Sequence, residues 1–175
     1  MTTQCDLSHI SNIQTKFQKP KNIYNKNTKK MKKVLNAIYS AILFLWQLPQ
    51  NLVALVMMPF IGKLTLLEHR NHQYVFEASK MMGGISLGTF IYLSPGLAQN
   101  QVYHEHELGH GFDSRWFGPL YLLVIGLPSL LWACTYNENS QCYYSFYTER
   151  RANRNIGTIE VKYPGFGDCY LVMKE

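Results

Sequence analysis

Charged side chains are scarce in this chain. They make up 16% of its 175 residues, against 47% for hydrophobic residues, whereas about 25% is usual for a soluble domain. The deficit is concentrated, because no charged residue occurs from Val34 to Gly62 or from Trp116 to Asn137. A chain of this length forms one domain by default. The composition favours a protein that shares part of its surface with lipid over a freely soluble one.

Several patterns with known chemistry are also missing. The chain has no glycine-rich phosphate loop, no nucleophile elbow and no internal repeat. The four cysteines, Cys5, Cys134, Cys142 and Cys169, form no CxxC pair, which argues against a cysteine-based metal site. Cys134 and Cys142 flank a polar turn and would be able to pair in an oxidising compartment, but free thiols fit the sequence equally well.

The net charge of +6 arises largely near the N-terminus, where eight lysines fall between Lys16 and Lys33. A basic flank directly before an apolar stretch is typical of the cytoplasmic side of a membrane span, and it attracts anionic head groups. No aromatic-interleaved basic motif accompanies the charge. We therefore expect membrane lipid as a partner, a cytoplasmic N-terminus and no nucleic-acid binding.

The chain divides into three expected parts. Residues 1–30 are polar without apolar periodicity, which predicts a disordered basic leader. Residues 31–62 predict a transmembrane anchor, because the uncharged run exceeds the roughly 20 residues needed to cross a bilayer, and two prolines predict a kinked helix or two half-helices. A cleaved signal is the alternative, and MKK at Met31 also resembles a translation start. Residues 63–175 form the third part.

The third part contains the run HELGH. On a helix, His106 and His110 lie on one face, where both imidazoles can reach a single metal ion. Glu107 can take a proton from water at that metal, which makes it the candidate general base. Leu108 points to the opposite side and is expected in the core, whereas Gly109 lowers helix propensity and implies close packing. The pattern predicts a hydrolytic zinc site.

A catalytic zinc has three protein ligands, so a third ligand must follow. Glu149 is the best candidate, because it lies in a stretch compatible with a helix and small Ala152, one turn later, would let that helix pack closely against the first. The alternative for Glu149 is an exposed carboxylate paired with neighbouring arginines. His104 is a second possible ligand, but it would need non-helical backbone to share a metal with His106. An oxyanion stabiliser is expected among Tyr143, Tyr144, Tyr147 and Arg150.

The two stretches together resemble the gluzincin metallopeptidases, in which HExxH is followed some tens of residues later by a Glu ligand in an ExxA[D/N]-type helix. The membrane peptidases of the prenyl-protein protease and heat-shock type are similar. The resemblance implies Zn²⁺ bound by His106, His110 and Glu149, with Glu107 as the base and a peptide or protein as substrate. Asn153 stands where the family often has Asp. That Asp orients a zinc-binding His, and an Asn can accept the same hydrogen bond without adding charge.

Two further stretches complete the expected fold. Residues 81–95 predict an extended strand or hairpin, which would either hold a peptide by strand addition or serve as core. Residues 116–137 contain Gly and Pro at positions that disfavour a straight span and predict a re-entrant or core helical hairpin. A true span would put His106 and Glu149 on opposite sides of the bilayer. We expect a mostly helical, zincin-like α+β fold with an N-terminal transmembrane helix.

The sequence thus predicts a membrane-anchored zinc metallopeptidase. The alternative is a non-catalytic integral membrane scaffold, or partner-binding protein, with a structural metal or none. A third possibility is metal sensing or transport, to which His104 would contribute. The oligomeric state stays open.

Overall fold

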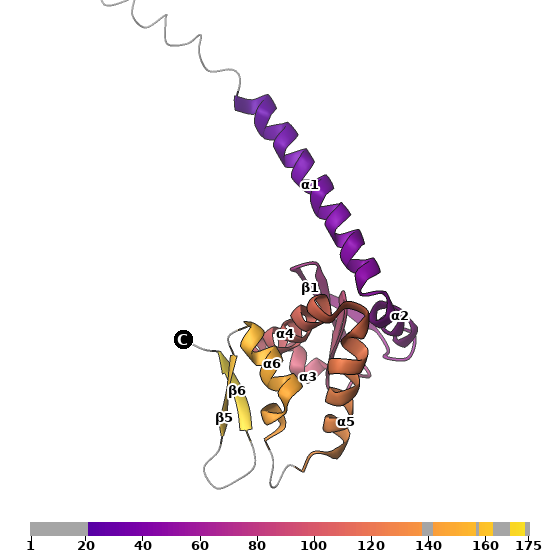
Figure 1. Ribbon diagram of the computed structural model, residues 1–175, viewed down its shortest axis with the longest axis vertical. Coiled ribbons are helices and arrows are strands. Elements are labelled where there is room, and N and C mark those ends of the chain that lie inside the picture. Colours follow the sequence, from indigo (N-terminus) through magenta and orange to yellow (C-terminus); the bar gives the residue numbers. More distant parts are fainter. Residues whose placement is uncertain (1–20, 138–141, 157, 163–168, 174–175) are drawn as a thin grey trace, which may run out of the picture. The chain divides into compact units, whose positions relative to one another are not determined.

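The computed structural model describes residues 21–137, 142–156, 158–162 and 169–173, with side chains over 27–137 and 142–156. The described part is mostly helical and contains a small mixed sheet (Figure 1), as expected of an α+β fold. The chain divides into two compact units, residues 1–40 and 41–175. The second unit contains the sheet and all the candidate metal ligands.

The first uncharged stretch forms two helices instead of one. Helix α1 spans Lys21–Trp46 and α2 spans Leu48–Met57, with Pro49 in the first turn of α2, where a missing N–H leaves no helical hydrogen bond unmade. The two helices meet at 84°, as expected of a kinked or divided helix. Residues 21–30, for which the composition predicted disorder, are helical, and residues 1–20 lie outside the described part.

Within the described residues no single helix is both long enough and apolar enough to cross a bilayer. Two bent helix pairs reach the required length and composition when taken together. One is α1 with α2, and the other joins residues 101–120 to residues 122–135 across a bend of 120°.

The sheet has four strands in the order β1-β2-β4-β3. Strand β1 (Leu64–Arg70) pairs antiparallel with β2 (Gln73–Ala78), β2 pairs parallel with β4 (Phe90–Leu93), and β4 pairs antiparallel with β3 (Gly84–Leu87). Strands β3 and β4 form the hairpin expected in residues 81–95. Strands β1 and β2 come from a polar stretch in which no strand was expected.

Alternate residues of the sheet pack against helices on its two faces. One face contacts α2 through a cluster that contains Ala54 and Tyr92. The other face contributes Val75, Ile91 and Leu93 to a cluster with Leu108 of helix α4 (Gln101–Phe117). Leu108 is 1% exposed, which confirms the expectation that it anchors the motif helix in the core.

The remaining elements follow the sheet. They are α3 (Pro95–Ala98), α4 (Gln101–Phe117), a 3₁₀ turn (Gly118–Leu120), a π-helical turn (Leu122–Gly126), α5 (Leu127–Thr135), a second 3₁₀ turn (Tyr143–Ser145), α6 (Tyr147–Ile156) and the antiparallel hairpin of β5 (Thr158–Lys162) and β6 (Cys169–Met173). Residues 116–137 are therefore a bent helical segment, as their glycines and prolines predicted. Figure 1 shows α4, α6 and α5 grouped together.

The side chains of two cysteines are described. Cys134 is an exposed free thiol, whereas Cys142 is disulfide-bonded. These two cysteines are therefore not paired with each other, and the pairing that the polar turn between them suggested is wrong.

Helices α4 and α6 approach closely where both carry small residues. A Cβ added to Gly109 would overlap the backbone carbonyl of Ala152 and would lie 3.0 Å from its Cα. Ala152 itself is fully buried. Asn155 donates to the carbonyl oxygen of Gly109 at 3.0 Å, which adds a polar contact between the same two helices. The close packing expected of Gly109 and Ala152 is confirmed.

We predict that Gly109→Ala lowers the free energy of unfolding by about 1 to 3 kcal/mol, because the new methyl group meets backbone that cannot rotate away. This loss exceeds the helix propensity that Ala would add. Urea unfolding followed by circular dichroism measures the change. Gly96→Ala is the control, since a Cβ there meets nothing within 4 Å. Equal stability of the two variants would contradict the prediction.

Candidate metal centre

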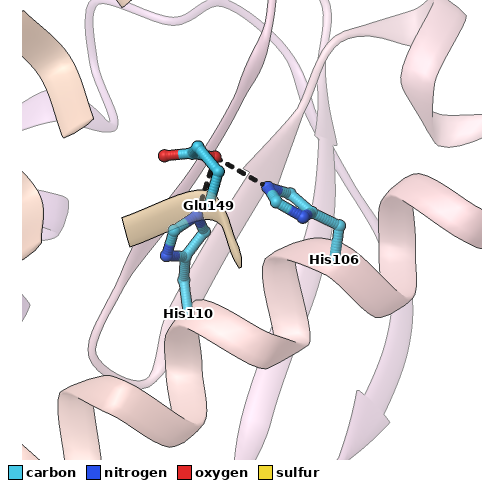
Figure 2. Close-up of side chains that lie close together, drawn as sticks. All are labelled: His106, His110 and Glu149. Carbon is cyan, nitrogen blue, oxygen red and sulfur yellow. Dashed lines mark hydrogen bonds and ion pairs between the residues drawn. The ribbon is translucent and has the colours of Figure 1, made fainter. Parts of the chain in front are cut away.

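His106, His110 and Glu149 converge on one buried point. Their nearest ligand atoms all lie within 4.8 Å of one another. Oε2 of Glu149 lies 3.0 Å from Nε2 of His106 and 3.3 Å from Nε2 of His110. Figure 2 shows the carboxylate of α6 reaching over the two imidazoles, which project from successive turns of α4. The structure thus brings together the three residues that the sequence proposed as metal ligands.

The donor set suits zinc. Two imidazole nitrogens and one carboxylate oxygen are ligand types that zinc binds in hydrolytic enzymes. Two atoms that each lie about 2.05 Å from a tetrahedral zinc are roughly 3.3 Å apart, close to the two nitrogen-to-oxygen distances observed here. Glu149 is 1% exposed, which excludes the alternative of a surface carboxylate paired with arginines. This buried group could hold a metal ion.

The Nδ1 atoms of His106 and His110, which face away from Glu149, differ from each other in their hydrogen bonding. Nδ1 of His106 contacts Oδ1 of Asn153 at 2.7 Å, so an Nδ1–H would donate to that oxygen and leave Nε2 free to bind metal. This is the orienting contact that the resemblance implied for residue 153. Nδ1 of His110 is buried and has no hydrogen-bond partner among the described residues. His106 is therefore the more firmly oriented of the two.

Glu107 lies beside the group but is not one of its three members. It is buried, and its carboxylate packs against Gly84 of β3. A Cβ on Gly84 would overlap the Glu107 carboxylate, so a side chain at that place would displace the carboxylate. The carboxylate that the sequence identified as general base is thus held between the motif helix and an edge strand of the sheet.

The carboxylates and imidazoles change one another's proton affinity. Burial alone would raise the pKa of Glu149, but His110 and His106 hold it well below its usual range. Burial alone would lower the pKa of His110, but Glu149 raises it to about 9. Burial raises the pKa of Glu107 above its ordinary value, and a cation at the site would favour its ionised form. The centre is electrostatically prepared for a positive charge.

The other candidates from the sequence occupy different positions. Nε2 of His104 contacts the Ala98 carbonyl oxygen at 2.9 Å, and His104 is not part of the group. Tyr147 donates to the Val124 carbonyl oxygen at 2.6 Å, and Arg150 is exposed. Tyr144 packs edge-on to the His106 ring, with ring centroids 5.4 Å apart.

Tyr143 and Tyr144 are the two expected oxyanion stabilisers that lie nearest the centre. Burial raises the pKa of Tyr143 well above its usual value, and the negative charges of Glu149 and Glu107 add to this effect. Burial is also the main cause of the raised pKa of Tyr144, to which Glu107 contributes. Both phenols therefore stay protonated at neutral pH and can donate a hydrogen bond.

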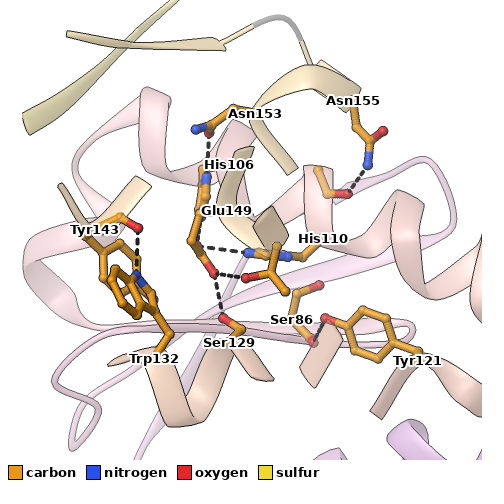
Figure 3. A network of polar contacts seen from close by, with 12 residues as sticks. Ser86, His106, His110, Tyr121, Ser129, Trp132, Tyr143, Glu149, Asn153 and Asn155 are labelled. Carbon is orange, nitrogen blue, oxygen red and sulfur yellow. Dashed lines mark hydrogen bonds and ion pairs between the residues drawn. The ribbon is translucent and has the colours of Figure 1, made fainter. Parts of the chain in front are cut away.

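Other residues at the centre were not foreseen from the sequence. Oε1 of Glu149 accepts hydrogen bonds from Ser129 and from Thr148 (Figure 3). Asp113 is fully buried and accepts from Arg151 at 2.6 Å and from Asn155 at 3.0 Å. Serine, threonine and aspartate carry no spacing signal, so no sequence pattern would have found these partners.

Comparison of the chain with protein-family models, with curated proteins and with solved structures gives no significant match. The assignment of chemistry to this centre therefore depends on its own residues and geometry.

We predict that Asn153→Ala lowers the affinity for zinc by about 10-fold to 100-fold, because His106 loses the group that orients its ring. Asn153→Asp should raise the affinity, since a carboxylate accepts the same hydrogen bond and adds negative charge. Competition titration with a chelator measures both values. Arg154→Ala is the control in the same helix, because the Arg154 side chain is exposed. Unchanged affinity in Asn153→Ala would count against the orienting role.

Proposed function

We propose that this protein is a membrane-anchored, gluzincin-like zinc metallopeptidase. The observation that carries the proposal is the buried convergence of His106, His110 and Glu149, with Glu107 next to the first ligand on the same helix. Three protein ligands with an adjacent carboxylate are what a hydrolytic zinc site requires, whereas a structural zinc site has four protein ligands. A fourth His, Cys, Asp or Glu ligand is absent from the group within the described residues.

The roles of the residues follow from their positions. His106, His110 and Glu149 would hold the metal, and Asn153 orients the His106 ring. Zinc bound there would supply a Lewis acid that polarises the scissile carbonyl and makes water a better nucleophile. Glu107 would take the proton of the attacking water and pass it to the departing amine nitrogen, as a general base and then a general acid. Tyr143 or Tyr144 would donate to the developing oxyanion.

The edge strand β3 supports a peptide as substrate. Within the described residues β3 pairs on one side only, with β4. On its other side the Ser86 carbonyl oxygen already accepts from Tyr121, and Ser86 and Leu87 are buried. An extended peptide would therefore add as a further strand beside Gly84 and Ile85, which are partly exposed, a mode of binding that tolerates many sequences. Gly84 in this strand touches the Glu107 carboxylate. A peptide that adds to β3 would therefore pass close to the proposed base.

Exposed apolar side chains support the membrane anchor. Helix α1 exposes a series of large hydrophobic residues, which includes Val34, Leu35, Ile38, Ile42 and Leu45. Eight lysines from Lys16 to Lys33 lie directly before Val34 in the sequence. On that basis we assign the N-terminus to the cytoplasmic side.

The bent segment 116–137 would enter the membrane without crossing it. Its outer surface exposes Leu123, Leu127, Leu130 and Leu131. Near its start Tyr121 donates to the carbonyl oxygen of Ser86 at 2.9 Å, and near its end Trp132 donates to that of Tyr143 at 2.8 Å. Both ends are thus attached to the unit that contains the metal centre. This arrangement allows His106 and Glu149 to lie on one side of the bilayer.

We predict that the full chain, purified in detergent, contains about one zinc ion per molecule and that His110→Ala and Glu149→Ala both reduce the content to background. Elemental analysis by mass spectrometry measures it. His104→Ala is the control on the same helix, because that side chain contacts a backbone carbonyl outside the group. Zinc retained in Glu149→Ala would exclude the three-ligand site, and zinc lost in His104→Ala would favour a metal-sensing or transport protein.

We predict that Glu107→Gln retains zinc but lowers peptide hydrolysis by a factor of about 100 to 10,000, because the amide cannot accept the proton of the attacking water. Cleavage of a mixed peptide library, followed by mass spectrometry, measures the rate. Glu105→Gln is the matched control, since Glu105 forms an ion pair with Arg70 on the neighbouring surface. Full activity of Glu107→Gln, or no hydrolysis by the zinc-loaded wild type, would favour a non-catalytic scaffold.

A further inference from the structure

The two oxygens of Glu149 have different partners. Oε2 faces Nε2 of His106 and of His110. Oε1 points the other way and accepts hydrogen bonds from Ser129 Oγ at 2.6 Å and from Thr148 Oγ1 at 2.9 Å. Figure 3 shows Ser129 on its helix directly below the carboxylate, on the side away from the two imidazoles. The carboxylate is thus held in one orientation.

This orientation determines how Glu149 would bind a metal. A carboxylate oxygen that accepts two hydroxyl hydrogen bonds has little capacity left for a metal ion, so Oε2 is the oxygen available to zinc. A catalytic zinc keeps one position open for water beside its three protein ligands. A carboxylate that turned and offered both oxygens would fill that position. The two hydroxyl groups therefore favour the binding mode that hydrolysis requires.

Of the two hydroxyl groups, Ser129 provides the long-range contact. Thr148 is the sequence neighbour of Glu149, whereas Ser129 belongs to α5 in the bent segment 116–137. Helix α5 and the π-helical turn before it are held at this place by hydrogen bonds on both sides of Ser129. Tyr147 donates to the Val124 carbonyl oxygen of the turn, and Trp132 of α5 donates to the Tyr143 carbonyl oxygen. A half-buried hydroxyl in so apolar a helix is favourable only when it is hydrogen-bonded. Ser129 donates to the third ligand, Glu149, and is also hydrogen-bonded to the side chain of Tyr143.

We propose that Ser129 is a positioning residue of the metal centre. It acts through Glu149, whose carboxylate it restricts to single-oxygen coordination. The proposal depends on the zinc site described above. It means that the bent segment 116–137, besides any contact with lipid, contributes a residue that orients a metal ligand.

The test compares Ser129→Val with Ser129→Thr in the full chain in detergent, because these side chains differ by the presence of the hydroxyl group. The first readout is zinc affinity by chelator competition. We expect Ser129→Val to bind zinc about 10-fold to 100-fold more weakly than wild type, and Ser129→Thr to remain within about 3-fold of it. Thr135→Ala is the control, since it removes another hydroxyl from α5, one that donates to the Leu131 carbonyl oxygen.

The second readout is the visible spectrum of the cobalt(II)-substituted protein, which distinguishes four-coordinate from five-coordinate metal. We expect a four-coordinate spectrum for wild type and Ser129→Thr, and weaker, five-coordinate absorption for Ser129→Val. Equal zinc affinity and identical spectra for the Val and Thr variants would overturn the positioning role while leaving the zinc site intact. Absence of zinc from the wild type would instead overturn the proposed function, so the two failures are distinguishable.

Discussion

The contact between α4 and α6 is the interaction on which the metal centre depends. The two His come from one helix and the Glu from another, so the centre exists only where the helices touch. Gly109 lies between the two His on α4, and Ala152 follows Glu149 by one turn on α6. Their small size allows the two backbones to lie so close together that a methyl group added to Gly109 would overlap the backbone of Ala152. Asp113 of α4 accepts hydrogen bonds from Arg151 and Asn155 of α6, and these bonds maintain the same contact further along the helices.

The first apolar stretch contributes to this unit as well as to the proposed anchor. Its amides are buried and hydrogen-bonded across to the end of the motif helix. Gln50 donates to Ser114 and to the Gly118 carbonyl oxygen, and Ser114 donates to Gln47. Asn51 accepts from the backbone and side chain of Thr89, next to β4. The amides thus act in packing, and they explain why the stretch divides into two helices at Gln47.

Much of the site could be predicted from the sequence because its ligands follow helical spacing. His106 and His110 lie one turn apart, and the small residue after Glu149 indicated a close helix contact. Strands β1 and β2 were not predicted, although Tyr74-Val75-Phe76 in β2 are residues that favour strands. The charged and polar residues around them suggested a loop, and their pairing is set by the sheet. Gly84 and Ser129 also escaped prediction. Each meets its partner only after the chain has folded, and neither residue type has a spacing that would single it out.

The placement of α5 has a consequence for which peptide bonds the centre can reach. One side of this helix carries Ser129, in contact with the Glu149 carboxylate, and another carries exposed leucines. A helix with its side chains is about 10 to 12 Å across, so the carboxylate lies about one helix diameter from that leucine surface. If the leucines contact lipid as proposed, the peptide bonds within reach are those close to the bilayer surface. Membrane-embedded proteins, and the short loops and tails that adjoin their spans, would then be better substrates than freely diffusing proteins.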